Sequence, residues 1–195
     1  GVSYDYLVFP ENFRAAPIAN DEESKSQMSP KAGLIYTPFK DTTVRAAYSR
    51  SLGGVSFDQS FQLEPSQVAG FNQTWRSIIP ESAGGSTSAP RFETLGVEWD
   101  QRFATRTYLG LRGEFLTSTV NREVGVFDLG APPGVPSGTR EHLDYRERTF
   151  TAMASQLLAE EWSVGASSRL SQADLDDSFV EIPAVTPSGF NARQD

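Results

Sequence analysis

The stretch FETLGVEWDQRFATRTYLGLRGEFLTS, residues 92–118, decides the fold, because side chains alternate between apolar and polar on both sides of a short turn. In a β-strand, successive side chains point to opposite faces of the sheet. One parity holds Leu95, Val97, Trp99 and Phe103 before the turn, and Leu109, Leu111 and Phe115 after it. The other parity carries charges before and after the turn. The stretch therefore predicts an antiparallel hairpin with one apolar face and one charged face.

The same alternation recurs along the chain, separated by connections that are short and long in turn. The predicted strands are residues 2–8, 31–37, 43–51, 92–103, 107–119, 145–158 and 162–171. The long connections are residues 9–30, 52–90, 120–143 and 172–195, and we expect them to be outer loops. Outer-membrane barrels combine short turns on one side with long loops on the other. The sequence therefore predicts an all-β fold, an antiparallel up-and-down transmembrane β-barrel segment of about seven strands.

Composition excludes several classes of function. The net charge is −8 and the pI is near 4.7, whereas a nucleic-acid partner requires a basic face. The chain has no cysteine, which excludes disulfides and thiolate metal sites. No apolar run reaches the roughly 20 residues of a membrane-spanning helix, but a spanning β-strand needs only about 9–11 residues.

The two strand faces predict two environments. The residues expected to face lipid are Leu34, Tyr36, Val44, Tyr48, Leu95, Val97, Trp99, Leu109, Leu111, Phe115, Trp162 and Val164. The residues expected to face the lumen are Arg45, Glu98, Asp100, Arg102, Arg112, Glu114 and Arg169. Aromatic residues near the strand ends are typical of the girdles at a membrane surface, although the core of a soluble sheet also contains aromatics.

Little in the sequence indicates catalysis or cofactor binding. His142 lies near Glu141 and Asp144, but no Gly-x-Ser-x-Gly nucleophile motif accompanies it, so we expect a surface histidine and no enzyme. The acidic pairs at 22–23, 160–161 and 176–177 lack EF-hand spacing and are interpreted as solvated charge rather than as calcium ligands. No cofactor is expected.

The connection 52–90 contains aromatic residues that favour a partly packed loop. Phe57, Phe61, Phe71 and Trp75 are its candidate ligand-binding residues, although the ligand itself is unknown. Ser66 is a candidate N-cap for a helical turn within residues 66–77. Long loops of this kind are usually functional or disordered.

Two neighbouring motifs resemble a known family. SPKAGLIYTP at 29–38, followed by TTVRAAYSRSLGG at 42–54, is similar to the barrel portion of TonB-dependent outer-membrane receptors. Leu63-Glu64-Pro65 and Phe92-Glu93-Thr94-Leu95-Gly96 resemble later elements of the same barrels. The resemblance implies a location in the bacterial outer membrane and TonB-energised uptake of a large solute, such as an iron chelate or a glycan.

The resemblance also implies partners. These are outer-membrane lipid, the rest of a 22-strand barrel, a plug domain, and TonB acting through that plug, and we therefore expect the chain to be an internal fragment. Residues 63–82 are also similar to barrel domains attached to periplasmic repeat segments, so a passive porin or export barrel without a plug is a second hypothesis. A soluble all-β binding module is the third, and a second sheet or a helix packed on Val97, Leu109 and Leu111 would favour it.

Overall fold

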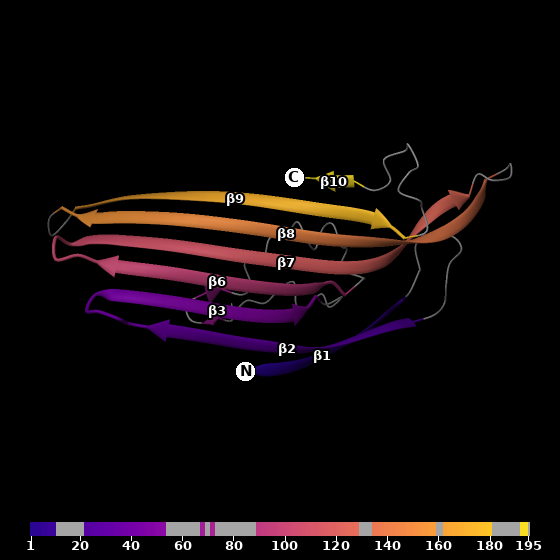
Figure 1. Ribbon diagram of the computed structural model, residues 1–195, viewed down its shortest axis with the longest axis horizontal. Coiled ribbons are helices and arrows are strands. Elements are labelled where there is room, and N and C mark those ends of the chain that lie inside the picture. Colours follow the sequence, from indigo (N-terminus) through magenta and orange to yellow (C-terminus); the bar gives the residue numbers. More distant parts are fainter. Residues whose placement is uncertain are drawn as a thin grey trace.

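A computed structural model describes residues 1–10, 22–53, 67–68, 71–72, 89–128, 134–158, 162–180 and 192–194. These residues form one large antiparallel sheet with seven long up-and-down strands (Figure 1). The strands are β1 Val2–Pro10, β2 Glu22–Tyr36, β3 Thr42–Leu52, β6 Arg91–Arg102, β7 Thr107–Asp128, β8 Val135–Leu157 and β9 Ser163–Phe179. The prediction of an all-β, antiparallel up-and-down fold is confirmed.

Three short strands accompany the seven long ones. β10, Ala192–Gln194, pairs with the end of β9 and adds an eighth strand to the sheet. β4, Gln67–Val68, and β5, Phe71–Asn72, form a separate two-stranded ladder. The helical turn predicted for 66–77 is therefore wrong at these four residues, and its other residues lie outside the described part of the chain.

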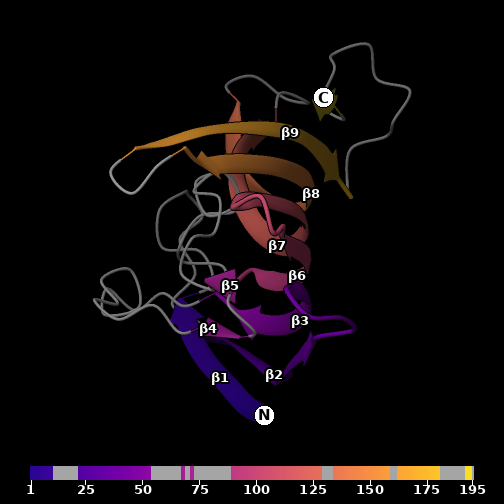
Figure 2. The ribbon, with the colours of Figure 1, turned by 90° about the vertical axis from the view of Figure 1, so that its left-hand side faces the viewer.

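The large sheet is open. Its strand order is β1-β2-β3-β6-β7-β8-β9-β10, so each long strand lies beside the one that follows it. β1 and β10 stand at the two edges, and the described strands do not close into a barrel. Seen from the end with the short turns, the strands follow an arc, and the sheet therefore has a concave side (Figure 2).

Short turns join β2 to β3 and β6 to β7 at the same end of the sheet (Figure 1). In the first turn the amide of Thr42 donates to the carbonyl oxygen of Phe39 over 3.2 Å, and in the second Arg106 donates to Phe103 over 3.0 Å. Asp41 and Arg106 have positive φ angles of 66° and 61°, which is the left-handed conformation that tight turns require. This geometry fixes the register of both hairpins.

The connections at the opposite end are shorter than the sequence predicted, because the strands are longer. The predicted loop 120–143 is wrong for most of its length, since 120–128 belongs to β7 and 135–143 belongs to β8. Residues 22–30 of the predicted loop 9–30 belong to β2, and 172–179 of the predicted loop 172–195 belong to β9. Polar residues interrupt the apolar alternation of these extensions, which continues only in part, as at Ala173 and Leu175 or at Val124 and Val126. Backbone pairing nevertheless continues.

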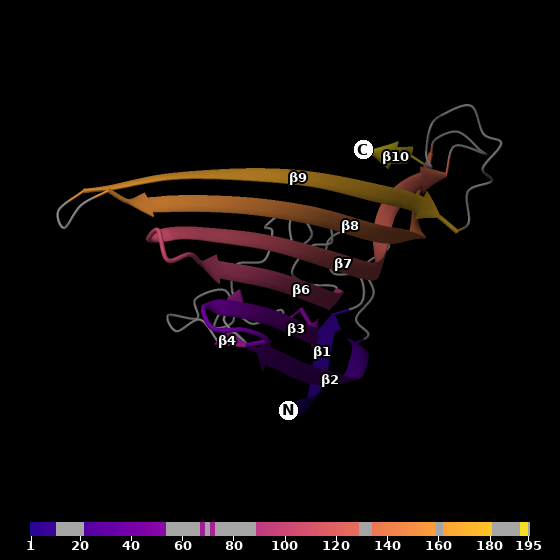
Figure 3. The same ribbon diagram turned by 60° about the vertical axis from the view of Figure 1, so that its left-hand side comes forward.

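β2 changes partner at its middle. Residues 22–30 pair with β1, whereas 31–36 pair with β3. The first half of β2 also reaches beyond its neighbours, because Lys25 Nζ donates to the carbonyl oxygen of Asn121 in β7 over 3.4 Å. β3 and β6 separate β2 from β7 in the sheet, so this half of β2 bends over their ends. Figure 3 shows β1, its antiparallel partner, at a steep angle to β3.

Two small apolar clusters hold this end together. Phe92, which is 1% exposed, packs with Leu116 and Tyr145, and Ala173 and Leu175 lie against them. A second cluster joins Leu52 and Ala89, with Leu7 of β1 packed on it. Alternation in the sequence did not predict this packing, because the residues of each cluster come from separate segments and meet only in the folded sheet.

Gly53 provides a test of the packing at the junction of β3 and β6. Its amide donates to the carbonyl oxygen of Pro90 over 2.6 Å, and a Cβ there would lie 2.7 Å from Phe92 Cε2 and 2.8 Å from Pro90 Cγ. We expect Gly53→Ala to lower the free energy of unfolding by about 1–3 kcal/mol through overpacking. Denaturant unfolding in detergent micelles, followed by tryptophan fluorescence, measures this.

Gly113→Ala is the matched control, because a Cβ at Gly113 meets no atom within 4 Å. We expect the control to change stability by less than about 1 kcal/mol. Equal effects of the two substitutions would contradict the close approach of Gly53 to Phe92.

Candidate functional site

The register of the sheet sorts its side chains into two faces. Leu111 of β7 lies opposite Trp99 of β6 and Ala152 of β8, whereas the next residue, Arg112, lies opposite Glu98 and Thr151. We call the face that carries Leu111 the outer face and the face that carries Arg112 the inner face. The two sets of residues that the sequence assigned to opposite parities lie on these two faces.

A ladder of charges crosses the inner face. Arg45, Glu98, Arg112, Thr151 and Arg169 are successive cross-strand partners on β3, β6, β7, β8 and β9. Glu98 accepts hydrogen bonds from Arg112 Nη2 at 2.8 Å and Arg112 Nε at 3.1 Å, and Arg45 Nη1 lies 3.9 Å from its other oxygen. Because two guanidinium groups flank Glu98, it remains paired although it is only 3% exposed.

The other predicted inner residues extend this ladder along the strands. Asp100 pairs with Arg45, so each charge of the Arg45–Asp100–Glu98–Arg112 group has an opposite partner. Glu114 lies opposite Gly96 and Thr149. The side chain of Arg169 is 66% exposed, and its guanidinium lies 3.9 Å from Glu147. The inner face is therefore strongly polar but nearly neutral at its centre.

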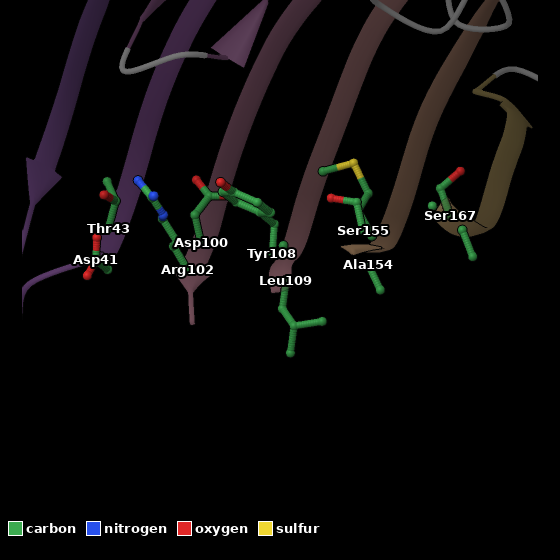
Figure 4. A pocket seen from close by; sticks show the side chains of 13 residues that line it. Asp41, Thr43, Asp100, Arg102, Tyr108, Leu109, Ala154, Ser155 and Ser167 are labelled. Atoms are coloured by element: carbon green, nitrogen blue, oxygen red, sulfur yellow. The ribbon is translucent and has the colours of Figure 1, made fainter. Parts of the chain in front are cut away.

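A hollow of about 660 Å³ lies on the inner face near the short turns (Figure 4). Thr43, Asp100, Tyr108, Ser155 and Ser167 project to the same side in this view, from five adjacent strands. Gly110 keeps the hollow open, because a Cβ there would lie 3.2 Å from both Asp100 Oδ1 and Met153 Cε. Hydroxyls, a carboxylate and a guanidinium give the lining of this hollow both hydrogen-bond donors and acceptors.

Sequence alternation predicted only part of this hollow. Asp100 and Arg102 were predicted as lumen residues, and the guanidinium carbon of Arg102 lies 5.7 Å from the ring centre of Tyr108. The contributions of Thr43, Tyr108, Ser155 and Ser167 were missed, although the parity of each strand already indicated them. Small hydroxyl side chains and one aromatic do not stand out in a sequence as charges do.

The outer face is apolar and uncovered. Leu111 is 42% exposed, Phe150 is 47% exposed and Leu170 is 68% exposed. The twelve residues predicted to face lipid lie on this face or, for Trp162, directly before β9. No second sheet or helix formed by the described residues packs on Val97 or Leu111, the packing that would favour a soluble module.

Polar side chains bound the apolar part of the outer face at both ends. Toward the short turns, the Thr42 hydroxyl donates to Gln101 Oε1 over 2.5 Å, and Thr107 donates to Gln156. Toward the long connections, Arg50 pairs with Glu93, and Arg146 Nη2 lies 2.6 Å from Asp144 Oδ2. The apolar residues between these boundaries form a band, which we call the outer band.

A separate polar cluster lies on the inner face beyond the level of the band. Arg122 pairs with Glu141, and burial raises the pKa of Asp177, with Glu141 raising it further and Arg122 opposing the rise. His142 lies on the other, outer face of the same strands; it is half-buried, and its Nδ1 lies 2.5 Å from Asn121 Oδ1. No three acidic or histidine side chains among the described residues are placed to hold a metal ion.

Of the four aromatic residues proposed to bind ligand in the connection 52–90, the structure describes only one. Phe57, Phe61 and Trp75 lie outside the described residues, and Phe71 is described only as part of the backbone of β5. In the described segments, no helix is long and apolar enough to cross a bilayer. No family model, curated protein or solved structure matches this chain.

Glu98 is the residue whose loss tests the inner ladder most directly. We expect Glu98→Gln to destabilise the sheet by about 1–3 kcal/mol, because Arg112 and Arg45 lose their shared carboxylate. Glu114→Gln is the control, since no ion pair involving Glu114 occurs in the described part of the chain. Denaturant unfolding in detergent micelles measures both, and an equal loss in the two variants would contradict the role assigned to Glu98.

Proposed function

We propose that this chain forms part of the wall of a transmembrane β-barrel in the bacterial outer membrane. The observation that carries the proposal is an inverted pattern of burial: Glu98 is 3% exposed, while Leu111 and Phe150 are 42% and 47% exposed. A protein folded in water places its apolar side chains inside. A barrel in lipid does the reverse, with an apolar outside and a polar lumen.

The length of the outer band fits this proposal. Between the polar boundaries β7 supplies nine residues, 108–116, and β6 supplies seven, 94–100, with the aromatic Phe103 just beyond Gln101. A strand needs about 9–11 residues to cross the hydrocarbon core. β7 has 22 residues and β8 has 23, so this hairpin extends well beyond the band on the side of the long connections. Such projecting hairpins are consistent with the long extracellular side of these barrels.

Aromatic residues at the short-turn edge of the band also support a membrane. Phe39, Phe103 and Trp162 are 76%, 41% and 71% exposed, and all three lie in or beside short connections. Large exposed aromatics are unfavourable in water, but they are favoured at the boundary between lipid and headgroups. We assign this edge to the periplasmic surface, since periplasmic turns are the short ones.

Within this class, we propose energised uptake of a large solute as the specific activity, with a plug domain and TonB as partners. The support is the resemblance of residues 29–38 and 42–54 to TonB-dependent receptors, and these residues lie mainly in the β2–β3 hairpin. A passive pore without a plug is the second candidate. The mutual pairing of Arg45, Asp100, Glu98 and Arg112 favours it, because a nearly neutral wall attracts neither cations nor anions strongly.

The assignment of faces predicts that an arginine on the outer face lowers stability in lipid more than an arginine on the inner face. We expect Leu111→Arg to destabilise the protein in lipid by about 2–4 kcal/mol, because it places a charge near the middle of the outer band. Ser167→Arg, on the inner face at the hollow, is the control and should cost less than about 1 kcal/mol. Unfolding in lipid vesicles measures both, and a harmless Leu111→Arg would show that the faces are assigned wrongly.

The location is tested by expressing the natural gene product in a Gram-negative host. We expect it in the outer-membrane fraction, extractable only with detergent, with an electrophoretic mobility that changes on heating because a detergent-resistant barrel unfolds. For the 195-residue chain itself we expect aggregation in water. A monomeric, cooperatively folding 195-residue product without detergent would contradict the proposal.

A further inference from the structure

The edge of the sheet at β9 is mostly free. In the described part of the chain, 163–174 pair only with β8, and β10 covers only the last part of β9. The free edge is about 12 residues long, or about 40 Å at 3.3 Å per residue. It contains most of the β9 part of the outer band, namely Val164, Ala166, Ser168 and Leu170. In lipid, unpaired backbone groups along such an edge would each cost several kcal/mol.

The pairing of β10 with β9 sets the direction and the register of a strand at this edge. Ala192, Arg193 and Gln194 lie opposite Asp177, Asp176 and Leu175, and the pairing is antiparallel. A strand that continues this register toward the short turns meets Asp174 first and Ser163 last. Its faces are then determined, because parity cannot change along a regular ladder.

The direction of the strands argues against a second copy as the occupant. The seven long strands alternate in direction, so β1 and β9 run the same way. Pairing β9 with β1 of another copy in the same membrane orientation would therefore be parallel, whereas membrane barrels are built from antiparallel strands. Pairing β9 with β9 of another copy is antiparallel, but it directs the long connections of the two copies to opposite sides of the membrane.

We propose that the free edge of β9 binds a strand antiparallel to it, in the register set by β10, with apolar side chains opposite Val164, Ala166, Ser168 and Leu170 and an acidic side chain opposite Arg169. The acidic position follows from the inner ladder. Arg112 has Glu98 as its direct cross-strand partner, whereas Arg169 lies opposite uncharged Thr151 and reaches a carboxylate of β8, that of Glu147, only at 3.9 Å. Its guanidinium remains 66% exposed on the side of the free edge. The outer positions follow from the outer band. This inference rests on the proposed function for the apolar requirement, but the register and direction do not depend on it.

The chain contains a suitable probe in its own β6. The peptide of residues 93–102, ETLGVEWDQR, pairs antiparallel with β7 in the folded sheet, and β7 runs in the same direction as β9. It carries Glu98 between Val97 and Trp99. With Glu98 opposite Arg169, its Val97 lies opposite Leu170 and its Trp99 lies opposite Ser168. The chain lacks cysteine, so single cysteines report unique contacts.

The experiment is disulfide trapping in detergent micelles between the full chain carrying Leu170→Cys and this peptide carrying Val97→Cys. We expect a mixed disulfide as the main product by mass spectrometry, and much less with Ser171→Cys, whose side chain points to the inner face. Replacing Glu98 by Lys in the peptide should lower the yield by up to about fivefold, as expected for a lost cross-strand charge pair.

The alternatives give different products. Equal trapping at Leu170→Cys and Ser171→Cys, or no mixed disulfide, would overturn the inference. Disulfide-linked dimers of chains carrying Leu170→Cys with chains carrying Tyr4→Cys would show a second copy at this edge and would overturn it too. Membrane insertion is measured separately on the same variants: a chain that inserts without trapping the peptide contradicts only this inference, and a water-soluble chain that traps it contradicts only the proposed membrane function.

Discussion

The cross-strand pairing of Glu98 with Arg112, directly behind Trp99 and Leu111, is the interaction on which the rest of the structure depends. Burying a carboxylate is unfavourable unless charged partners surround it, and here two arginines do so. Since side chains alternate, satisfying the charges on the inner face forces the neighbouring apolar residues onto the outer face. A shift of one residue would reverse both faces along the whole hairpin, so the ion pairs fix the register as well as the environment of each face.

Alternation in the sequence was sufficient to predict the strands that cross the outer band and the charged residues of the inner ladder. It failed in 120–128 and 135–143, where polar residues interrupt the apolar period. Backbone pairing, the Arg122–Glu141 ion pair and the buried side chains of Val120 and Leu143 hold these strand ends together. Alternation also missed the Phe92–Leu116–Tyr145 cluster, whose residues come from three strands and meet only after the register is set. Alternation predicted only part of the hollow, because glycine and hydroxyl residues mark a polar strand face less clearly than charged residues do.

The free edge of β9 differs from the strand edges of soluble proteins. A soluble protein would protect a long strand edge with charge, proline or a covering segment. β9 instead presents small and apolar residues along its free edge, with β10 starting an antiparallel partner at one end. Under the proposed function, the curvature of the sheet, its polar inner face and its free edge belong to one wall of a larger closed barrel. The hollow lined by Asp100, Tyr108 and Ser167 then faces the interior of that structure.

The most direct test is the accessibility of spin labels attached along β7 from 109 to 116, one position at a time, in the natural gene product reconstituted in lipid vesicles. Collision with oxygen, which concentrates in lipid, should be high at positions 109, 111, 113 and 115. Collision with a water-soluble nickel complex should be high at 110, 112, 114 and 116. This alternation with a period of two residues would place the outer face in lipid and the inner face in water. High accessibility to the nickel complex at every position would show that both faces are in water and would contradict the account.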